Sequence, residues 1–156
     1  MTTPEREQKL RELEEAIQRG TMWTVLLHHA TATKAGMNVT DAQCINALHL
    51  DGPQTPGQLA QLMGITTGGA ITAVIDRLEK AGHVKRTRDP DDRRRVIIEL
   101  VPESLERFGR YFGPVATAFD DEVAKLDDDK VQVLIDWMKE NNALMPKVID
   151  EVRRMP

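Results

Sequence analysis

Apolar residues recur every three or four positions over most of this sequence, as they do in amphipathic helices. Residues 5–34 contain few helix breakers and keep this spacing at Leu10, Leu13 and Ile17, which predicts one long helix. A last helix is expected after Asp127, a residue type that caps helix starts. Its apolar face consists of Val131, Leu134, Ile135, Met138, Met145, Val148, Ile149 and Val152. The sequence therefore predicts long helices at both ends of the chain.

Two short helices are expected between them, each introduced by a threonine with a glutamine three residues later, which is the capping-box pattern. Thr40 and Gln43 begin the first, which we expect to end at residues 51–53. Thr55 and Gln58 begin the second, which has proline at its first position and glycine at its end. We expect its core side chains to be Leu59, Leu62, Met63 and Ile65.

The stretch "TTGGAITAVIDRLEKAG", residues 66–82, predicts a third helix in this region. Its expected buried face, at positions i, i+3, i+4 and i+7, consists of Ile71, Val74, Ile75 and Leu78. The opposite face carries small residues near its start and charged residues farther along: Gly69, Thr72, Ala73, Asp76, Arg77 and Lys80. The small side chains allow another surface to approach the start of this helix closely.

A β-hairpin is expected next, because "HVKRTR" and "RRVIIEL" are β-prone and flank Asp89-Pro90-Asp91-Asp92, a run of turn-forming residues. We expect Val96, Ile98 and Leu100 to face the core. From Pro102 to Leu126 the pattern is helical again, and Pro114 is expected to kink this helix without ending it.

Composition fits one soluble globular domain of 156 residues, with 40% hydrophobic and 29% charged residues. The longest apolar stretches, such as residues 24–27 and 131–135, fall far short of the roughly 20 residues that cross a bilayer. The N-terminus is charged, unlike a signal peptide. We therefore expect a cytoplasmic protein with no membrane partner. The single cysteine, Cys44, excludes an intrachain disulfide and a multi-cysteine metal site.

Charge is unevenly distributed, although the net charge is −4. Residues 76–95 contain eight cations and five anions, so this segment is positive while the remainder of the chain is negative. A local contact with a polyanion requires such a basic island, because phosphate affinity depends on the charge at the contact. A solvated charged loop is the alternative interpretation, and it is common for charge runs.

The helix expected at residues 55–64, the helix expected at residues 66–82 and the basic hairpin after them form the pattern of a winged helix-turn-helix. In this motif the second of the two helices enters the major groove of DNA. Candidate DNA-binding residues on that helix are Thr66, Thr67, Gly68, Gly69, Thr72, Ala73 and Arg77. Free amides at the helix start favour a phosphate, and threonine hydroxyls bond to phosphates or base edges. Arg77 lies farther along and is expected to reach a phosphate or a carboxylate. For Gly68 and Gly69 the alternative is a poorly capped helix start with no ligand.

The expected wing tip contains Arg93, Arg94 and Arg95 as further candidate DNA-binding residues. A narrow minor groove attracts guanidinium groups. We expect Asp92 to support the wing by holding a neighbouring guanidinium while Arg94 projects into the groove. The alternative is a surface network between these arginines and the nearby aspartates, and both interpretations can hold together.

Residues 66–101 resemble the signature of the multiple antibiotic resistance regulator (MarR) family, especially "DRLEKAG" followed by "DPDDRR" and an alternating strand. The resemblance implies a homodimer on a palindromic double-stranded DNA operator, most often acting as a repressor. Asp92 matches the family's wing aspartate and Arg94 its wing-tip arginine. Val101 departs from the pattern, since the family usually has threonine there, so the next helix is expected to start at Pro102 or to be less firmly fixed.

The expected fold class is mainly α with a small β-hairpin wing. We expect a winged helix-turn-helix lobe at residues 37–101 and a helical dimerisation lobe built from residues 5–36 and 102–156. The terminal apolar faces support a homodimer independently of the family, because a monomer of this length would struggle to cover them.

A small-molecule effector is a weaker hypothesis drawn from the resemblance, because many relatives respond to small aromatic acids or phenols. Trp23, Leu27 and His28 are candidates for such a pocket, although Trp23 and Leu27 are more simply explained as core residues. We expect no cofactor and no metal site. Cys44 is expected to be a buried small hydrophobe rather than a redox sensor.

Two classes of function remain open from the sequence. The first is a dimeric, ligand-responsive DNA-binding regulator, and the second is a winged-helix protein-interaction module whose basic wing meets an acidic partner. An enzyme fits poorly, because the sequence shows no nucleophile-base pairing, phosphate loop or metal-ligand set at a recognisable spacing.

Overall fold

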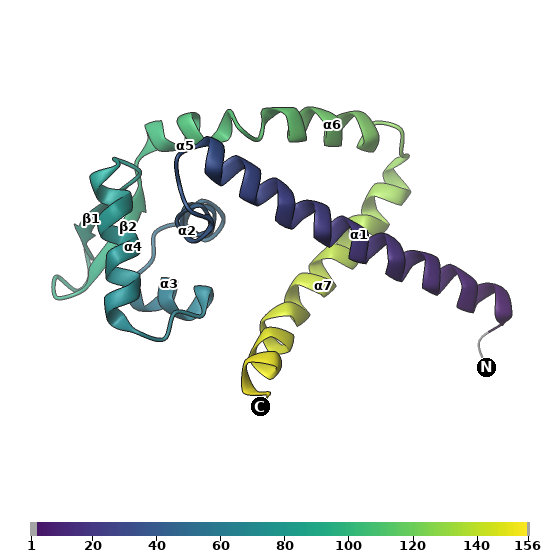
Figure 1. The fold of residues 1–156 in the computed structure, drawn as a ribbon, viewed down its shortest axis with the longest axis horizontal. Helices are drawn as coiled ribbons and strands as arrows, with labels where there is room; N and C mark the ends of the chain where they lie inside the picture. The colour runs from purple at the N-terminus through teal and green to yellow at the C-terminus, as the bar shows by residue number, and fades with distance from the viewer. Residues whose placement is uncertain (1–2, 156) are drawn as a thin grey trace. The chain divides into compact units, whose positions relative to one another are not determined.

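The computed structural model describes residues 3–155, which fold into helices and one two-stranded antiparallel sheet (Figure 1). The elements are, in order, α1 (Pro4–Lys34), α2 (Val39–Asp51), α3 (Pro56–Met63), α4 (Gly68–Lys80), β1 (Val84–Arg88), β2 (Val96–Leu100), α5 (Pro102–Gly109), α6 (Gly113–Val123) and α7 (Asp128–Arg154). This architecture confirms the predicted fold class of a mainly helical chain with a small hairpin.

The chain divides into two compact units between Phe112 and Gly113. The first unit contains α1 to α5 with the hairpin, and the second contains α6 and α7. The prediction divides the chain by function instead, into a DNA-binding lobe at residues 37–101 and a dimerisation lobe that combines residues 5–36 with residues 102–156. This division concerns assembly and stays a prediction.

The core of the first unit lies between α2, α3, α4 and the hairpin. The predicted face of α4 is confirmed, since Ile71, Val74, Ile75 and Leu78 are all buried. Leu59 of α3 is fully buried, but Leu62 is 52% exposed, so the prediction that Leu62 belongs to the core is wrong. α3 has only 8 residues and turns one narrow face inward, which leaves Leu62 on the outer side.

The predicted N-terminal cap is confirmed for α3 and wrong for α2. At α3, Thr55 Oγ1 accepts a bond from the Gln58 amide at 3.3 Å, and Gln58 Oε1 accepts one from the Thr55 amide at 2.9 Å. At α2 the cap is Asn38 rather than Thr40, because Asn38 Oδ1 accepts from the Asp41 amide at 2.8 Å. Asparagine caps somewhat more strongly than threonine, so the helix begins earlier than predicted.

The hairpin pairs Val84 with Leu100 and Arg88 with Val96 at its two ends. Ile98 is fully buried, while Val96 and Leu100 pack against the core, as the alternating pattern predicted. The backbone of Gln54 forms an isolated bridge to Ile98, which ties the segment before α3 to the edge of the sheet. Figure 1 shows the hairpin beside α4, with the loop between its strands extending away from the unit.

The helical region after the hairpin is broken where the sequence predicted only a kink. α5 ends at Gly109 and α6 begins at Gly113, so Pro114 lies in the first turn of a new helix. Proline is tolerated there because the first amides of a helix have no partner within the helix. Val101 precedes α5 and makes no side-chain cap, and the helix starts at Pro102 as expected.

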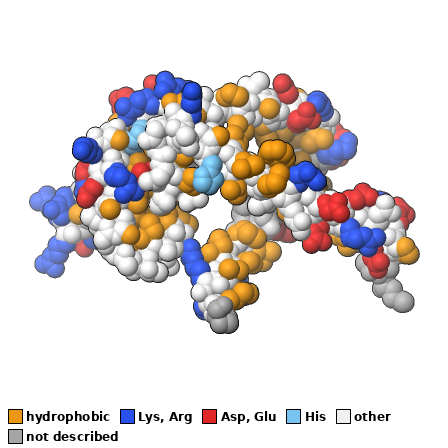
Figure 2. Space-filling view, viewed as in Figure 1, with side chains coloured by type: hydrophobic (Ala, Val, Ile, Leu, Met, Phe, Trp, Pro, Cys, Tyr) orange, Lys and Arg blue, Asp and Glu red, His pale blue; other side chains and the backbone are white. Residues whose placement is uncertain are grey.

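Large apolar side chains are exposed along the terminal helices. They include Leu13, Trp23 and Leu26 of α1, and Leu134, Met138, Val148 and Val152 of α7. Figure 2 shows hydrophobic side chains gathered on α7. Within residues 3–155 no single helix is long and apolar enough to span a membrane. Only α3 and α4 counted together, with a bend of 107° between them, meet that criterion of length and composition.

Candidate nucleic-acid interface

The start of α4 is exposed. Thr67 is its N-cap residue, yet the Thr67 side chain makes no capping hydrogen bond. Gly68 and Gly69 have open space where a Cβ atom would stand, and neither has a positive φ. Neither the backbone conformation nor the packing of the chain therefore requires glycine at these positions. The uncapped amides and the bare backbone suit close approach by an anionic partner.

The outer face of α4 continues with Thr72 and Ala73, both exposed. The Thr72 hydroxyl donates to the Gly68 carbonyl at 2.8 Å, so its proton is occupied within the helix. Its free lone pairs can accept a bond, and its methyl group can contact apolar surface. Thr66 is exposed just before the helix, where its hydroxyl is available.

Arg77 anchors α4 to α2 through an ion pair with Asp41. Its Nη2 lies 2.6 Å from Asp41 Oδ1, and its Nε donates to Asp41 Oδ2 at 3.2 Å. Hydrogen bonding to Asp41 raises the pKa of Arg77. Asp41 is buried while the Arg77 side chain is half exposed. The sequence predicted either a phosphate or a carboxylate as the partner of Arg77, and the structure shows the carboxylate of Asp41.

Arg86 joins the wing to α4 on another side. Its guanidinium pairs with Asp76 and Glu79, and its backbone amide donates to Glu79 at 3.2 Å. Hydrogen bonding to Asp76 is the main cause that raises the pKa of Arg86. The two arginines thus tie the same helix to α2 and to β1, which fixes the outer face of α4 relative to the hairpin.

Asp89 organises the turn of the wing. Asp89 Oδ1 accepts from the amides of Asp91 and Asp92 at 2.9 and 3.2 Å, and Asp89 Oδ2 lies 3.7 Å from the Arg95 guanidinium. The two amide bonds, helped by the charge of Arg95, lower the pKa of Asp89. The turn is therefore held by an ionised carboxylate at its base.

Asp92 supports the wing in a different way from the one predicted. Its Oδ1 accepts from the backbone amide of Arg94 at 3.0 Å, and its carbonyl accepts from the Arg95 amide at 2.8 Å. The carboxylate beside a guanidinium is that of Asp89. Asp92 thus orients Arg94 through the main chain, because the tight turn brings its carboxylate to an amide.

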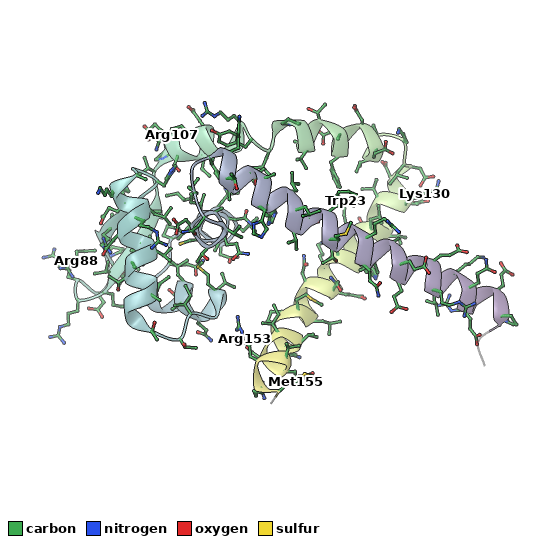
Figure 3. All side chains as sticks on the ribbon, viewed as in Figure 1. Trp23, Arg88, Arg107, Lys130, Arg153 and Met155 are labelled. Atoms are coloured by element: carbon green, nitrogen blue, oxygen red, sulfur yellow. The ribbon has the colours of Figure 1, made fainter. Side chains whose placement is uncertain are left out.

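The cations of the wing divide into paired and unpaired groups. Lys85, Arg86 and Arg95 each lie beside a carboxylate. Arg88, Arg93 and Arg94 are exposed, and in the part of the chain that the structure describes none has a carboxylate partner. Figure 2 shows Lys and Arg side chains over the wing, and Figure 3 labels Arg88 there. The positive charge available to a ligand is therefore concentrated at the tip and flank of the hairpin.

Comparison with known proteins identifies this arrangement. Residues 35–95 match the sequence profile of the MarR family. The chain is 32% identical over 131 residues to the HTH-type transcriptional regulator YcgE of Bacillus subtilis (strain 168), a match that covers 84% of each protein. The chain belongs to the MarR family of transcriptional regulators.

Solved MarR family structures share the fold. A MarR family protein from Bacillus stearothermophilus superposes with a TM-score of 0.68 at 19% identity, covering 89% of this chain and 96% of that one. A mutant of MarR from E. coli, solved with operator DNA, gives a TM-score of 0.54 at 20% identity and covers 85% of this chain and 94% of its own. The predicted resemblance and the winged helix-turn-helix are confirmed, and the protein is a DNA-binding regulator by family.

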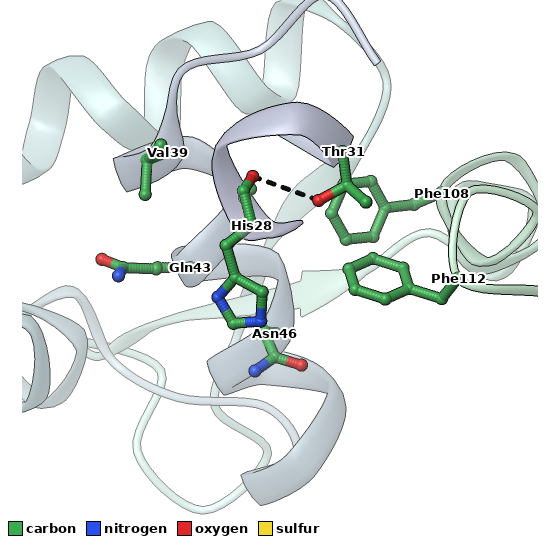
Figure 4. A pocket seen from close by; sticks show the side chains of 8 residues that line it. His28, Thr31, Val39, Gln43, Asn46, Phe108 and Phe112 are labelled. Carbon is green, nitrogen blue, oxygen red and sulfur yellow. Dashed lines mark hydrogen bonds between the residues drawn. The ribbon is translucent and has the colours of Figure 1, made fainter. Parts of the chain in front are cut away.

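A pocket in two parts that share Asn46, Phe108 and Phe112 lies beside α2, and Figure 4 shows the smaller part. One part, about 40 Å³, is lined by His28, Thr31, Val39, Ala42, Gln43, Asn46, Phe108 and Phe112. A second part, about 340 Å³, is lined by Ile45, Asn46, His49, Leu105, Phe108, Gly109 and Phe112. Phe108 and Phe112 lie with ring centroids 5.2 Å apart and belong to both.

The predicted pocket residues are only partly brought together. His28 lines the smaller part, with its ring 6.3 Å from that of Phe112. Trp23 lines neither part of this pocket, so its role in a ligand site stays a prediction. It is 60% exposed, which contradicts the alternative of an ordinary core residue in this chain. Leu27 is partly buried but does not line the pocket. Trp23 precedes His28 by more than one helical turn, so it projects from a different part of α1.

Cys44 is fully buried in α2, and burial raises its pKa to about 11, with the charge of Asp41 as the second cause. This environment is that of a structural cysteine, as the sequence predicted. No cluster of three or more histidine, cysteine or acidic side chains suited to a metal ion is found among residues 3–155.

Three residues of this interface escaped the sequence prediction. Asp41 and Arg86 hold α4, and Arg88 adds an unpaired cation. The position of Arg88 could have been found, because it ends the first predicted strand beside the turn. The partner of Arg77 could not, since Asp41 lies 36 residues away in the chain.

Proposed function

We propose that this protein is a homodimeric regulator that binds a palindromic double-stranded DNA operator and represses transcription. The observation that carries the proposal is the set of guanidinium groups without carboxylate partners on the wing, next to the uncapped start of α4. Both belong to one compact unit in which Arg77 and Arg86 fix α4.

In this proposal α4 reads the major groove. Thr66, Thr67, Gly68 and Gly69 meet a phosphate and the groove edge, and Thr72 and Ala73 contact bases. Arg77 has a supporting role, because its guanidinium is bound to Asp41. Any phosphate contact by Arg77 would use only the donors left free by that ion pair.

The wing reaches the minor groove with Arg94 at its tip. Asp92 holds the Arg94 amide, which leaves the Arg94 side chain free to project. Arg93 and Arg88 are free to meet flanking phosphates, whereas Arg95 is partly neutralised by Asp89. We therefore assign the strongest contacts to Arg94 and Arg93, and a weaker, orienting one to Arg95.

Dimerisation is supported by the apolar side chains exposed on α1 and α7. Burial of such surface is the main driving force for association. We propose that residues 5–36 and 102–156 form the dimerisation lobe and that residues 37–101 form the DNA-binding lobe. A two-fold dimer places two α4 helices in half-sites one helical turn apart, roughly 34 Å.

Release by a small ligand is proposed for the pocket beside Phe108 and Phe112. Its volume, about 340 Å³, is within the range of small-molecule sites. Its lining combines aromatic rings with the polar side chains of His49 and Asn46, and His28 lines the adjoining smaller part. These groups suit a small aromatic molecule with one or two polar substituents. Binding beside α2 would shift the element to which Arg77 anchors α4.

Capture of genomic DNA fragments by the purified protein, followed by sequencing and footprinting, tests the proposal. We expect enriched fragments with an inverted repeat and two protected half-sites about one helical turn apart. Absence of duplex binding at low salt across the whole library would contradict the regulator. It would favour the alternative, a winged-helix module that binds an acidic protein.

A further inference from the structure

Arg86 lies between the anchored base of the hairpin and its exposed tip. Successive side chains of a strand point to opposite faces, so Val84, Arg86 and Arg88 share one face of β1. Val84 is buried in the core, whereas Arg88 is exposed beside the turn, where Figure 3 labels it. Arg86 pairs with Ile98 of β2, which is fully buried. The position of Arg86 therefore marks the point at which the hairpin leaves the core.

Arg86 joins this point to α4 through both its side chain and its backbone. Its guanidinium pairs with Asp76 and Glu79, and its backbone amide donates to Glu79 Oε1 at 3.2 Å. Residues three apart lie on the same side of a helix, so one guanidinium fork reaches both carboxylates. An attachment through several atoms restricts the rotation of the hairpin as well as its distance from α4.

The other ion pairs of the hairpin stay within it. Lys85 Nζ lies 3.1 Å from Glu99 on the opposite strand, and the Arg95 guanidinium lies 3.7 Å from Asp89 in the turn. Neither pair reaches α4. Across the described hairpin, Arg86 therefore makes all of the ion pairs and side-chain hydrogen bonds that link the wing to α4.

Arg86 also neutralises charge on the helix that is proposed to face DNA. Asp76 belongs to the outer face of α4, and its side chain is 59% exposed. Hydrogen bonding to Asp76 is the main cause that raises the pKa of Arg86, so the guanidinium stays charged. Carboxylates repel phosphates at close range. Removal of Arg86 should therefore have two effects, since it detaches the wing from α4 and leaves Asp76 and Glu79 unpaired.

We propose that Arg86 is a positioning residue that holds the wing at one distance from α4, so that the protein selects operators with one spacing between the bases read by α4 and the minor-groove tract entered by the wing. The inference rests on the proposed function, in which α4 and the wing bind DNA together. One inserted base pair moves the tract by about 3.4 Å along the duplex and by roughly a tenth of a turn around it. A wing attached to α4 by Arg86 does not follow this displacement, whereas a detached wing does.

The spacing is tested with a captured operator duplex and a second duplex that carries one extra base pair on the outer side of each half-site, between the footprints of α4 and the wing. The insertion leaves the distance between the two half-sites unchanged. Fluorescence anisotropy gives the dissociation constant of the full chain for each duplex, and their ratio is the insertion penalty. We expect a penalty of about tenfold or more for the unaltered protein, the size of a lost arginine contact, and less than about threefold for Arg86→Gln.

Two variants serve as matched controls for Arg86→Gln. Lys85→Gln removes the same charge from the neighbouring residue and breaks an ion pair within the hairpin, but it keeps the link to α4. It should retain the full insertion penalty. Arg86→Lys keeps a cation that can pair with Asp76 or Glu79, and it should restore part of the penalty.

A triple variant, Asp76→Asn, Glu79→Gln and Arg86→Gln, separates position from charge. It leaves none of these three charges unpaired, so its affinity for the original operator should recover relative to Arg86→Gln. Its insertion penalty should stay as small as that of the single variant, because the wing is still detached. The triple variant also decides the result if Arg86→Gln melts early.

An insertion penalty in Arg86→Gln equal to that of the unaltered protein would overturn the inference, as would the absence of a penalty in the unaltered protein. An equal reduction in Lys85→Gln would do the same, because it would assign the effect to lost charge rather than to the link with α4. In each of these cases the protein still binds the operator, so the proposed function stands. Failure to bind any duplex would overturn both.

Discussion

Arg77 on α4 and Asp41 on α2 form a two-point ion pair, with N–O distances of 2.6 and 3.2 Å, that ties α4 to the core of its unit. Asp41 is only 6% exposed, whereas the Arg77 side chain is 49% exposed. The two partners therefore depend on each other unequally. A buried carboxylate without its cation is costly, but a half-exposed guanidinium without its carboxylate is solvated by water.

This inequality predicts different effects for the two substitutions that remove one charge of the pair. Arg77→Gln should lower the free energy of unfolding by about 2 kcal/mol, because it leaves the Asp41 charge buried and unpaired. Asp41→Asn should cost less, about 1 kcal/mol, because solvent screens the exposed arginine. Urea denaturation measures both.

Arg153→Gln provides the control, because it breaks an exposed ion pair with Asp150 on α7 and should change stability by less than about 0.5 kcal/mol. Equal losses for Arg77→Gln and Asp41→Asn would contradict the structural role assigned to the buried carboxylate.

Gly69 provides a test that separates stability from DNA binding. It lies in α4 with a negative φ and open space around it, so Gly69→Ala should raise the melting temperature through its gain of up to about 1 kcal/mol in helix propensity. The added methyl group stands on the face proposed to enter the groove, so DNA affinity should fall. A rise in melting temperature with unchanged affinity would remove Gly69 from the interface.

The turn of the wing should loosen in acid. The pKa of Asp89 is lowered below its ordinary value of 3.8 by the amide bonds, so its carboxylate stabilises the turn above that value. This contribution is lost as the pH falls through the lowered pKa of the folded state. NMR titration of the Asp91 and Asp92 amides should show a midpoint below 3.8.

Asp89→Asn is the control for that titration, because it leaves no carboxylate at position 89 to titrate. A midpoint at or above the ordinary value in the unaltered protein would contradict the proposed hydrogen bonds.

Cys44 should be inert while the protein is folded. It is the single cysteine, it is fully buried, and its pKa is raised to about 11 by burial and by Asp41. Reaction with a thiol reagent such as Ellman's reagent at pH 8 should therefore proceed only as fast as the chain opens, and become rapid in denaturant. Rapid reaction of the folded protein would reopen a redox role.

The sequence predicted the features that short segments decide. The buried face of α4 follows from the spacing of Ile71, Val74 and Leu78, and the start of α3 follows from Thr55 and Gln58. Each depends on contacts within a few residues, so a local pattern is sufficient.

The sequence prediction missed features that depend on two competing local signals or on residues far apart in the chain. Asn38 and Thr40 are rival caps two residues apart, and the stronger one begins α2. Pro114 suits both a kink and a helix start, and the preceding turn at residues 110–112 selects the start. The ion pair of Arg77 with Asp41 spans 36 residues, so only the folded chain brings it together.

The central claim, that the wing tip binds DNA, is tested most directly by fluorescence anisotropy of a captured operator duplex at several salt concentrations. Arg94→Ala should cost about 1 to 3 kcal/mol and lower the salt dependence by about one unit of slope, while Arg11→Ala, which removes an equal charge from α1, should do neither. Equal affinity and an unchanged slope for Arg94→Ala would contradict this account of the wing.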